Sequence, residues 1–270
     1  MKLRDVLAAL GFRKGPKTYG YTIKEFELTN RELVRFAVWL HPKCSAPDIG
    51  QGAIDELRKY LSPGDAVIDI GAHVGDTSVL YALAVGSGGK VFAVEPNRYL
   101  WPVLEANASL NRQAAPIEIM HFAATGQPTK LVFNYSDPGY CNGGDLDRFG
   151  RLAHGHMYPL EVEGRNVLAE LRATSPDWLS RIRLIKTDAE GNDHAVLETM
   201  RELIVSVRPF ILCEVYKRTS IEQRTAFLDF LNELGYDCHR SWPYAELKGQ
   251  LLNAADMERW PHFDMFCVPR

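Results

Sequence analysis

The sequence predicts an α/β fold: a doubly wound, mostly parallel sheet of about seven strands, with an N-terminal extension and an inserted loop. Strand-like and helix-like segments alternate through most of the chain after residue 65. The strand segments are nearly continuous apolar runs, which are typical of parallel strands covered on both faces. A glycine-containing turn follows the first of them, where such folds bind ligands. At 270 residues and 46% hydrophobic composition, the chain can bury the core of one such domain.

The first part of the chain lacks this alternation. TYGYTIKEFEL and LVRFAVWL have the β-branched and aromatic content of short strands, and IGQGAIDELRKYL has apolar residues at helical spacing. A turn from Ser62 to Asp65 ends that helix. We therefore expect residues 1–61 to be an extension of helical and short-strand segments packed on the core, and residues 62–270 to be the main Rossmann-like domain.

The first half of the main domain has a regular pattern. AVIDI, KVFAVE and IEIMHFAA predict three strands, and TSVLYALAV and RYLWPVLEANASLN predict the two helices between them. This β-α-β-α-β order predicts a parallel sheet with right-handed crossovers.

The pattern breaks at residues 126–178, which we expect to be an insert that contacts substrate or acts as a lid. TKLVFNY predicts an added strand, and residues 136–159 are rich in Gly, Asp and His without periodicity. The alternation then resumes with strand RIRLIKT, helix HAVLETMRELIV, strand PFILCEVY, a helix near residues 221–234 and strand DMFCVP. Together these segments complete a sheet of about seven strands.

Composition limits the partners and the compartment. The 31 basic and 34 acidic side chains nearly cancel, so neither nucleic acid nor an anionic membrane is favoured. No apolar run approaches the roughly 20 residues of a membrane span, and the N-terminus is unlike a secretory signal. The five cysteines are odd in number and lack CxxC pairs, which indicates reduced thiols. We expect a cytoplasmic protein with a small-molecule or glycan partner; a homodimer is one candidate assembly.

The turn after the first core strand, VIDIGAHVGDT, has the form of a nucleotide-binding turn. Gly71 lacks the Cβ that would obstruct a ligand, and Gly75 allows the helix start to pack closely. Asp69 can accept a hydrogen bond from an ammonium group. Glu95 ends the next strand, 24 positions after Gly71, close to the spacing at which an acidic residue binds ribose hydroxyls.

Two alternatives compete for this turn. A dinucleotide needs GxGxxG, whereas the sequence has GxxxG with His73 inside it, so a nicotinamide-dependent oxidoreductase is disfavoured. The turn and Glu95 could also be purely structural. S-adenosylmethionine carries no phosphate, and it needs an acceptor for its amine, a carboxylate for its ribose and an apolar adenine slot. We therefore expect S-adenosylmethionine as cofactor and S-adenosylhomocysteine as product.

The segments VIDIGAHVGDTS, VFAVEPN, IRLIKTDAEGNDHAVLETM and PFILCEVY resemble the FkbM family of methyltransferases, over residues 65–216. The resemblance implies the class I methyltransferase fold and methylation of hydroxyl oxygens on sugars, lipid-linked glycans and polyketide-like metabolites. One departure is His73, where that family usually has Asn. The motifs predict these cofactor-binding residues: Asp69, Gly71, Ala72, His73, Gly75, Thr77, Glu95, Pro96, Asn97 and Asp188.

Charged residues at the ends of the later strands are the catalytic candidates, because ligands in open α/β sheets lie beyond the carboxyl ends of the strands. Lys186, Asp188 and Glu190 are spaced by two, so they would project to one side if the strand continued that far, and Glu214 ends the next strand. Methyl transfer requires alignment and removal of the hydroxyl proton. Asp188 is the leading base candidate, with Glu190 as alternative. The remaining catalytic candidates are loop histidines, His154 and His156.

Other interpretations of these residues stay open. Lys186 could form a structural ion pair with Glu190 or Glu214. The acidic residues could hold a divalent cation, although we predict no metal site. The acceptor could be an amine or carboxylate, or the chain could bind S-adenosylmethionine without turnover. Several aromatic residues could stack on an acceptor, although core packing would account for most of them: Tyr135, Tyr140, Trp242, Trp260 and Phe263.

Overall fold

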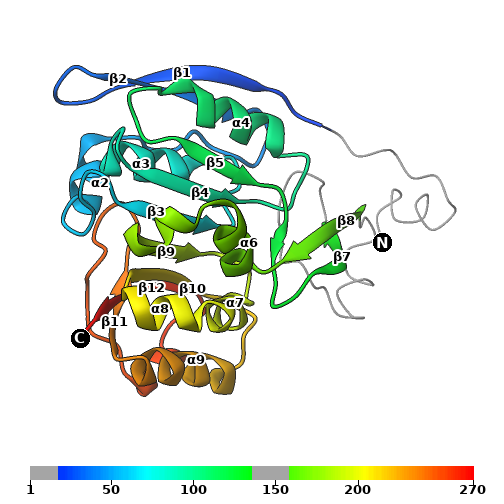
Figure 1. Ribbon diagram of the computed structural model, residues 1–270, viewed down its shortest axis with the longest axis vertical. Helices are drawn as coiled ribbons and strands as arrows, with labels where there is room; N and C mark the ends of the chain where they lie inside the picture. The colour runs from blue at the N-terminus through cyan, green and yellow to red at the C-terminus, as the bar shows by residue number, and fades with distance from the viewer. Residues whose placement is uncertain (1–17, 136–157) are drawn as a thin grey trace, which may run out of the picture.

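The computed structural model describes residues 18–135 and 158–270. Within them, a seven-stranded sheet forms the centre of the molecule (Figure 1). Its strands lie in the order β11 (Tyr236–Ser241), β12 (Phe263–Pro269), β10 (Phe210–Val215), β9 (Ile182–Thr187), β3 (Ala66–Ile70), β4 (Lys90–Val94) and β5 (Ile117–Met120). Strand β12 is antiparallel to both of its neighbours, and the pairs from β10 to β5 are parallel. The predicted mostly parallel sheet is confirmed.

Helices cover both faces of this sheet, so the doubly wound arrangement is also confirmed (Figure 1). One face packs against α2 (Gln51–Leu57), α3 (Asp76–Val85) and α4 (Trp101–Leu110). The other packs against α6 (Val167–Thr174), α7 (Asp193–Thr199), α8 (Arg201–Val207) and α9 (Ile221–Glu233). Alternate strand residues enter the two apolar clusters: Val67 faces α3, whereas Ile68 faces the α6–α9 side.

Local sequence explains several helix boundaries. Pro102 lies in the first turn of α4, where the missing N–H has no helical partner to lose. Ser220 begins α9 with a capping box: its hydroxyl accepts from the Gln223 N–H at 3.3 Å, and Gln223 accepts from the Ser220 N–H at 2.8 Å. The single helix predicted over HAVLETMRELIV is wrong, because the non-helical backbone of the buried Met200 (φ −106°, ψ 11°) divides it into α7 and α8.

The N-terminal segment forms a separate two-stranded sheet of β1 (Tyr21–Glu27) and β2 (Leu33–Trp39), at positions where the sequence predicts strands. Helix α4 satisfies the second edge of β2. Asn107 accepts from the Ala37 N–H at 2.6 Å and donates to the Ala37 carbonyl at 3.1 Å. Asn111 makes the same two bonds to Arg35, at 2.9 and 2.8 Å. The hairpin is therefore joined to the core by hydrogen bonds between these two side-chain amides and the backbone of β2.

A third sheet lies beside the main one (Figure 1), in the strand order β6 (Ala123–Ala124), β8 (Tyr158–Arg165) and β7 (Thr129–Tyr135); β7 and β8 belong to the insert, and β6 lies just before it. Strand β7 is the added strand predicted at TKLVFNY. Strand β8 was missed, because its sequence YPLEVEGR adjoins the aperiodic stretch. Two short 3₁₀ helices, η1 (Pro176–Arg181) and η2 (Ala254–Glu258), complete the described elements.

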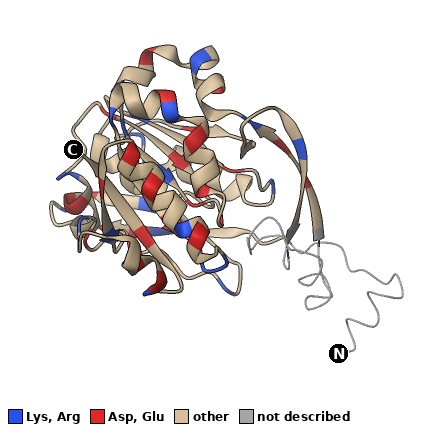
Figure 2. Ribbon diagram, turned by 90° about the horizontal axis from the view of Figure 1, so that it is seen from below, with Lys and Arg blue, Asp and Glu red and all other residues tan. Residues whose placement is uncertain are grey.

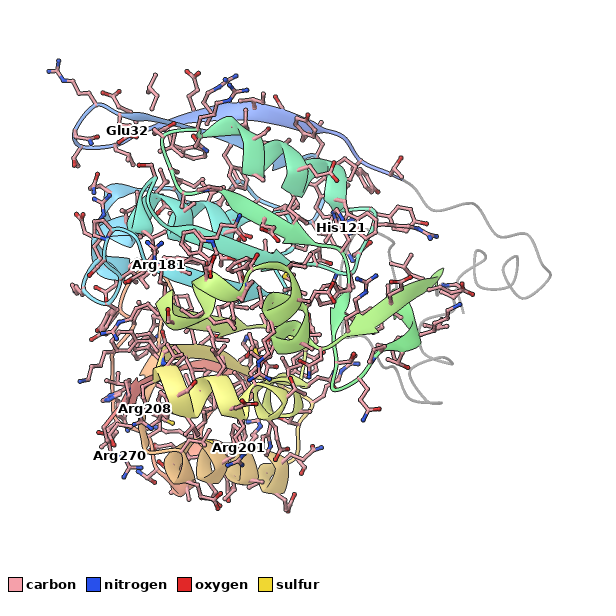
Figure 3. All side chains as sticks on the ribbon, viewed as in Figure 1. Glu32, His121, Arg181, Arg201, Arg208 and Arg270 are labelled. Carbon is pink, nitrogen blue, oxygen red and sulfur yellow. The ribbon has the colours of Figure 1, made fainter. Side chains whose placement is uncertain are left out.

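Acidic and basic side chains are mixed over the surface (Figure 2), as the near-balance of charges in the sequence predicts. Figure 2 shows acidic and basic residues interspersed over the helices. Two arginines (Figure 3) bind the end of α9 and the turn after it: Arg208, at the end of α8, donates to the Gly235 carbonyl at 2.8 Å, and Arg270, after β12, donates to the Asn232 carbonyl at 2.7 Å. No helix in the described part of the chain is both long and apolar enough to cross a bilayer. The described cysteines are unpaired thiols: Cys44, Cys213, Cys238 and Cys267.

Candidate active site

The turn after β3 is held against both neighbouring strands. The N–H groups of Gly71 and Ala72 donate to the Val94 carbonyl at 3.0 and 3.1 Å. Gly71 has φ +76°, and a Cβ built on it would lie 2.2 Å from the Asp188 carbonyl oxygen. The missing Cβ of Gly71 therefore makes room for the backbone of Asp188, whereas the sequence predicted that it makes room for a ligand. Glycine is needed so that the chain leaving β9 can lie against the end of β3.

The same turn contains two further left-handed residues. Gly75 has φ +88°, and a Cβ there would lie 2.8 Å from Leu104 Cδ1, so the glycine permits α3 to begin close to α4. His73 has φ +51°, and its ring meets the Trp39 ring edge-on with centroids 5.6 Å apart. Burial is the main cause that lowers the pKa of His73, so the ring is neutral at pH 7.

Asp69 is fully buried below the turn. Its Oδ2 accepts from Thr77 Oγ1 at 2.6 Å and from Ser78 Oγ at 2.5 Å, and its Oδ1 lies 3.2 Å from Lys186 Nζ. These contacts fix the first turn of α3 to the sheet. The assignment of Asp69 and Thr77 to cofactor binding stays a prediction, and the geometry favours an indirect part for both.

Lys186 links this buried carboxylate to the exposed end of β9. Its Nζ donates to the Gly71 carbonyl at 2.9 Å and lies 3.8 Å from Asp188 Oδ2. Burial alone would lower the pKa of Lys186, but the carboxylates of Asp69 and Asp188 outweigh it and raise the pKa, so the ammonium stays charged. The suggested ion pair with Glu190 or Glu214 is wrong: the structure pairs Lys186 with Asp69, its neighbour in the β3–β9 register.

Glu95 connects the turns that follow β3 and β4. Its Oε2 accepts from the His73 N–H at 2.9 Å, and its Oε1 accepts from the Asn97 N–H at 2.7 Å. The residue is 3% exposed, and burial is the main cause that raises its pKa to about 7. Each carboxylate oxygen keeps a second lone pair for a ligand hydroxyl. Trp101 donates its indole N–H to the Glu95 carbonyl at 2.9 Å, which fixes the start of α4 here.

The loop after β9 separates the acidic candidates. The Asp188 N–H still donates to the Ile70 carbonyl at 3.0 Å, and the Asp188 side chain is 49% exposed. Glu190, at φ +52°, hydrogen-bonds Tyr216; burial is the main cause that raises the Glu190 pKa. The buried Asp193 accepts from the N–H groups of this loop, including that of Gly191 at 3.3 Å. The strand therefore ends too early to align Glu190 with Lys186 and Asp188.

A cavity of about 460 Å³ opens where these turns meet, at the carboxyl ends of β3, β4 and β9. Its size lies within the range of small-molecule sites. Of the predicted site residues, Gly71, Glu95, Pro96, Asp188 and Glu190 line it. Its apolar walls were not among the predicted site residues, because they come from β6, from β7 of the insert and from α7: Ala123, Leu131, Val132, Phe133, Ala195 and Val196.

Glu214 lies at a second cavity, of about 330 Å³, between α7, β10 and the start of α9. Its Oε1 is 3.4 Å from His262 Nδ1, and the side chain is 8% exposed. Burial is the main cause that raises the pKa of Glu214 to about 9, with further contributions from Asp188 and other nearby carboxylates. Burial likewise raises the pKa of Asp264, its neighbour on β12, to about 6. His262 and Asp264 were missed because only the strand pairing places them here.

The two loop histidines and the aromatic residues suggested for acceptor stacking do not line the cavity between β3, β4 and β9, or lie outside the described residues. His154, His156 and Tyr140 lie outside the described residues, as does the side chain of Tyr135. Trp260 packs against Phe263 with ring centroids 5.4 Å apart, and Trp242 is 42% exposed beside Arg240. Within residues 18–135 and 158–270, no three Asp, Glu, His or Cys side chains are grouped closely enough to hold a metal ion.

One family model matches more than half of the chain. The model of the methyltransferase FkbM domain matches residues 69–238. Among solved structures, the chain is similar to methyltransferase FkbM from Methylobacillus flagellatus KT, at 16% identity and TM-score 0.45, over 76% of this chain and 44% of that chain. It is also similar to Aeropyrum pernix fibrillarin with natively bound S-adenosyl-L-methionine, at 13% identity and TM-score 0.44, over 94% and 100%. A third is the O-methyltransferase from Bacillus cereus with SAH, at 15% identity and TM-score 0.44, over 85% and 84%. No curated protein matches the chain.

Proposed function

The chain belongs to the FkbM family of S-adenosylmethionine-dependent methyltransferases, whose model matches more than half of it, and from that premise we propose that it is an O-methyltransferase. The proposed acceptor is a hydroxyl of a sugar, a glycan, or a glycosylated or polyketide-like metabolite. We also propose that it acts in the cytoplasm, where its unpaired thiols would stay reduced.

The single observation that carries the cofactor assignment is the cavity lined by Gly71, Glu95 and Asp188. Its apolar wall from β7 and α7 suits an adenine ring, and the free lone pairs of Glu95 suit the ribose hydroxyls. The backbone of Gly71 would hold the methionine end of the cofactor. The donor set therefore fits S-adenosylmethionine, which when bound supplies a methyl group on a positively charged sulfur.

Asp188 is the proposed base. Its carboxylate lines the cavity, is half-exposed and lies beside the charged Lys186, which steadies its position. It would accept the proton of the acceptor hydroxyl as that oxygen forms its bond to the methyl carbon. The walls of the cavity would align the acceptor oxygen with the methyl group and limit the access of water.

Isothermal titration with S-adenosylmethionine, S-adenosylhomocysteine and NAD tests this proposal. We expect saturable binding of the first two, and transfer of labelled methyl to hydroxylated acceptors. Binding of NAD alone would overturn the class. Binding of S-adenosylmethionine with methyl transfer only to amines or carboxylates would overturn the O-methyl assignment.

A further inference from the structure

A stack of arginine and tryptophan side chains lies at the end of β11, outside the two cavities described above. We call it the Arg240 stack: Arg240, Trp242, Arg259 and Trp260. The Arg240 Cζ lies over the Trp242 ring, 4.4 Å from its centroid, and over the Trp260 ring, 3.9 Å from its centroid. The Arg259 Cζ lies over the Trp260 ring at 4.8 Å. Cation–π contacts therefore join all members of the stack.

The guanidinium of Arg240 has no polar partner in the part of the chain that the structure describes. The residue is half-buried, and its Nε is buried without a hydrogen-bond partner. Within residues 18–135 and 158–270, no carboxylate forms an ion pair with Arg240 and no oxygen accepts from its side-chain N–H groups. The carboxylate of the nearby Asp256 lies 3.6 Å from Arg259 Nη1 instead. Arg240 is therefore a positioned cation whose hydrogen-bonding capacity the described protein leaves unused.

The buried Arg224 shows the opposite arrangement and fixes one side of the stack. It donates to the Trp260 carbonyl at 2.8 Å and to the Pro261 carbonyl at 2.6 Å. Its other bonds also go to oxygens of the protein: Thr219 Oγ1 and the carbonyls of Tyr216 and Met257. Arg224 thus holds the segment that carries Trp260, and protein oxygens use its N–H groups.

Trp242 is held on the other side of the stack. A Cβ built on Gly249 would lie 2.7 Å from Trp242 Cζ3, so glycine at this position lets the chain lie against the indole. The Trp242 N–H donates to the Glu246 carbonyl at 2.8 Å, which closes the turn after β11. Trp242 nevertheless stays 42% exposed. Its ring is therefore fixed in place with part of its surface open to a ligand.

The strand register places the stack at the carboxyl edge of the sheet, on the side of the cofactor cavity. Pairing runs from Arg240 through β12 and β10 to Thr187, the residue before Asp188. Three steps between neighbouring strands separate the two positions by about 14 Å. Arg240 is two residues from Cys238, which belongs to the apolar cluster of α6–α9, so it projects to the face that α7 covers. Helix α7 also lines the cofactor cavity.

We propose that the Arg240 stack binds an oxyanion of the acceptor, either a phosphate or a carboxylate group. This inference rests on the proposed function above and adds a negative charge to the acceptor. A planar guanidinium matches both groups with two parallel N–H···O bonds. The exposed part of Trp242 would pack on the ring that carries the anion. Because about 14 Å separates the two strand ends, an acceptor that reaches both Arg240 and Asp188 is longer than one sugar ring.

Saturation-transfer NMR on the full chain with S-adenosylhomocysteine bound tests the anion site. The probes are glucose 1-phosphate, glucuronate and methyl glucoside, which share a sugar ring and differ in charge. We expect saturable binding of at least one anionic probe, and weaker binding of methyl glucoside. In Arg240→Gln, affinity for the anionic probe should fall about tenfold or more, because charge-assisted hydrogen bonds are lost. Tighter binding of glucose 1-phosphate assigns a phosphate, and tighter binding of glucuronate assigns a carboxylate.

Arg183→Gln is the matched control. The Arg183 Cζ also lies over an aromatic ring, 4.9 Å from the Phe210 centroid, but near the amino end of β9. This variant should bind the anionic probe as the wild type does. Arg240→Lys keeps the charge and loses the planar fork, so it should also bind the probe more weakly, and it serves if Arg240→Gln does not fold. Thermal unfolding checks the folding of each variant.

Equal affinity for the anionic probe in the wild type and a folded Arg240 variant would reduce the stack to a packing contact and overturn the site. Equally tight binding of methyl glucoside, or no binding of either anion to the wild type, would also overturn it. Failure to bind S-adenosylhomocysteine while an anionic probe still binds would count against the proposed function alone.

Methyl transfer tests whether the anion belongs to the acceptor. Lactose with 3′-sialyllactose, and maltose with maltose 1-phosphate, are neutral and anionic pairs longer than one ring. The anionic member should have the lower KM, and Arg240→Gln should raise that KM while kcat stays within about twofold, as expected for a contact made equally in the ground and transition states. Methylation of the neutral members alone would overturn this part of the proposal.

Discussion

Glu95 holds two turns together and also faces the cavity, so its substitution should affect the ligand directly. In Glu95→Gln, the amide NH₂ group cannot accept from the backbone N–H that one carboxylate oxygen now binds. We expect S-adenosylmethionine affinity to fall by about 1.5 to 3 kcal/mol, the range for a charge-assisted hydrogen bond. Calorimetry measures this, with Glu118→Gln on β5 as control. Unchanged affinity would remove Glu95 from the ribose site.

Asp188 can be tested apart from folding because its side chain is half-exposed. Asp188→Asn keeps the shape but removes the proton acceptor, so turnover should fall on the order of 10²-fold or more. The melting temperature should stay near that of the wild type. Steady-state methyl transfer and thermal unfolding give the two values, with the exposed Asp229→Asn as control. Comparable turnover in wild type and Asp188→Asn would exclude it as the base.

The raised pKa of Glu214 should make the free energy of unfolding depend on pH. Its pKa is about 9 in the folded protein against 4.5 for an ordinary Glu, so the folded state holds this proton longer than the unfolded state does. The contribution of Glu214 to the free energy of unfolding therefore falls as pH rises from about 4.5 towards 9. Glu214→Gln has no proton to lose. Its melting temperature relative to wild type should rise between pH 5 and pH 8.5, and a constant difference would contradict the raised pKa.

At residue scale, backbone conformation explains one departure from the family pattern. His73 stands where the resembled family usually has Asn, and its φ of +51° lies in the left-handed region, where Asn, Asp and His are the enriched non-glycine residues. The turn can therefore keep its path with either residue. The sequence shows that His73 replaces the usual Asn, but only the structure shows the left-handed backbone conformation that both residues can adopt.

At the scale of elements, the contact between α4 and β2 depends on a few side-chain amides. Asn107 makes three hydrogen bonds, two to Ala37 and one to the Val74 carbonyl at 2.8 Å in the cofactor turn. Asn107→Ala should lower the free energy of unfolding by roughly 2 to 4 kcal/mol, because buried backbone groups lose their partners. Urea unfolding measures this, and Ser109→Ala on the exposed side of α4 should have little effect. Equal stability in the two variants would show that β2 is held by packing alone.

Element periodicity made most of the fold predictable. Buried strands such as AVIDI and helices such as TSVLYALAV are marked by apolar spacing, and the glycine turn between them fixes their order. The division into α7 and α8 was not predictable, because Met200 belongs to the same apolar pattern on both sides. Strand β8 was missed because part of it alternates charged with apolar residues next to an aperiodic loop.

At the scale of the whole molecule, candidate residues could be predicted only where the turn motifs carry them. Gly71, Glu95 and Asp188 follow from local sequence and all line the cavity. The Lys186–Asp69 pair, the β7 wall of the cavity and the Glu214–Asp264 pair depend on which distant strands become neighbours. No spacing within a single segment encodes that information, so the sequence pointed to Glu214 without its neighbour Asp264.

The antiparallel strand β12 has a consequence for the order in which the sheet assembles. It follows β11 in the chain but lies between β10 and β11 in the sheet. Within the seven-stranded sheet, β11 therefore pairs with β12 alone. Strand β11 can therefore join the sheet only after β12 has paired with β10, or together with β12 as a preformed pair. Strands β3, β4 and β5 pair with one another across shorter stretches of sequence than β10 does with β12, and loop-closure entropy favours the earlier formation of the β3–β5 part. Folding would then form the part of the sheet that carries the Gly71 and Glu95 turns before the edge formed by β12 and β11.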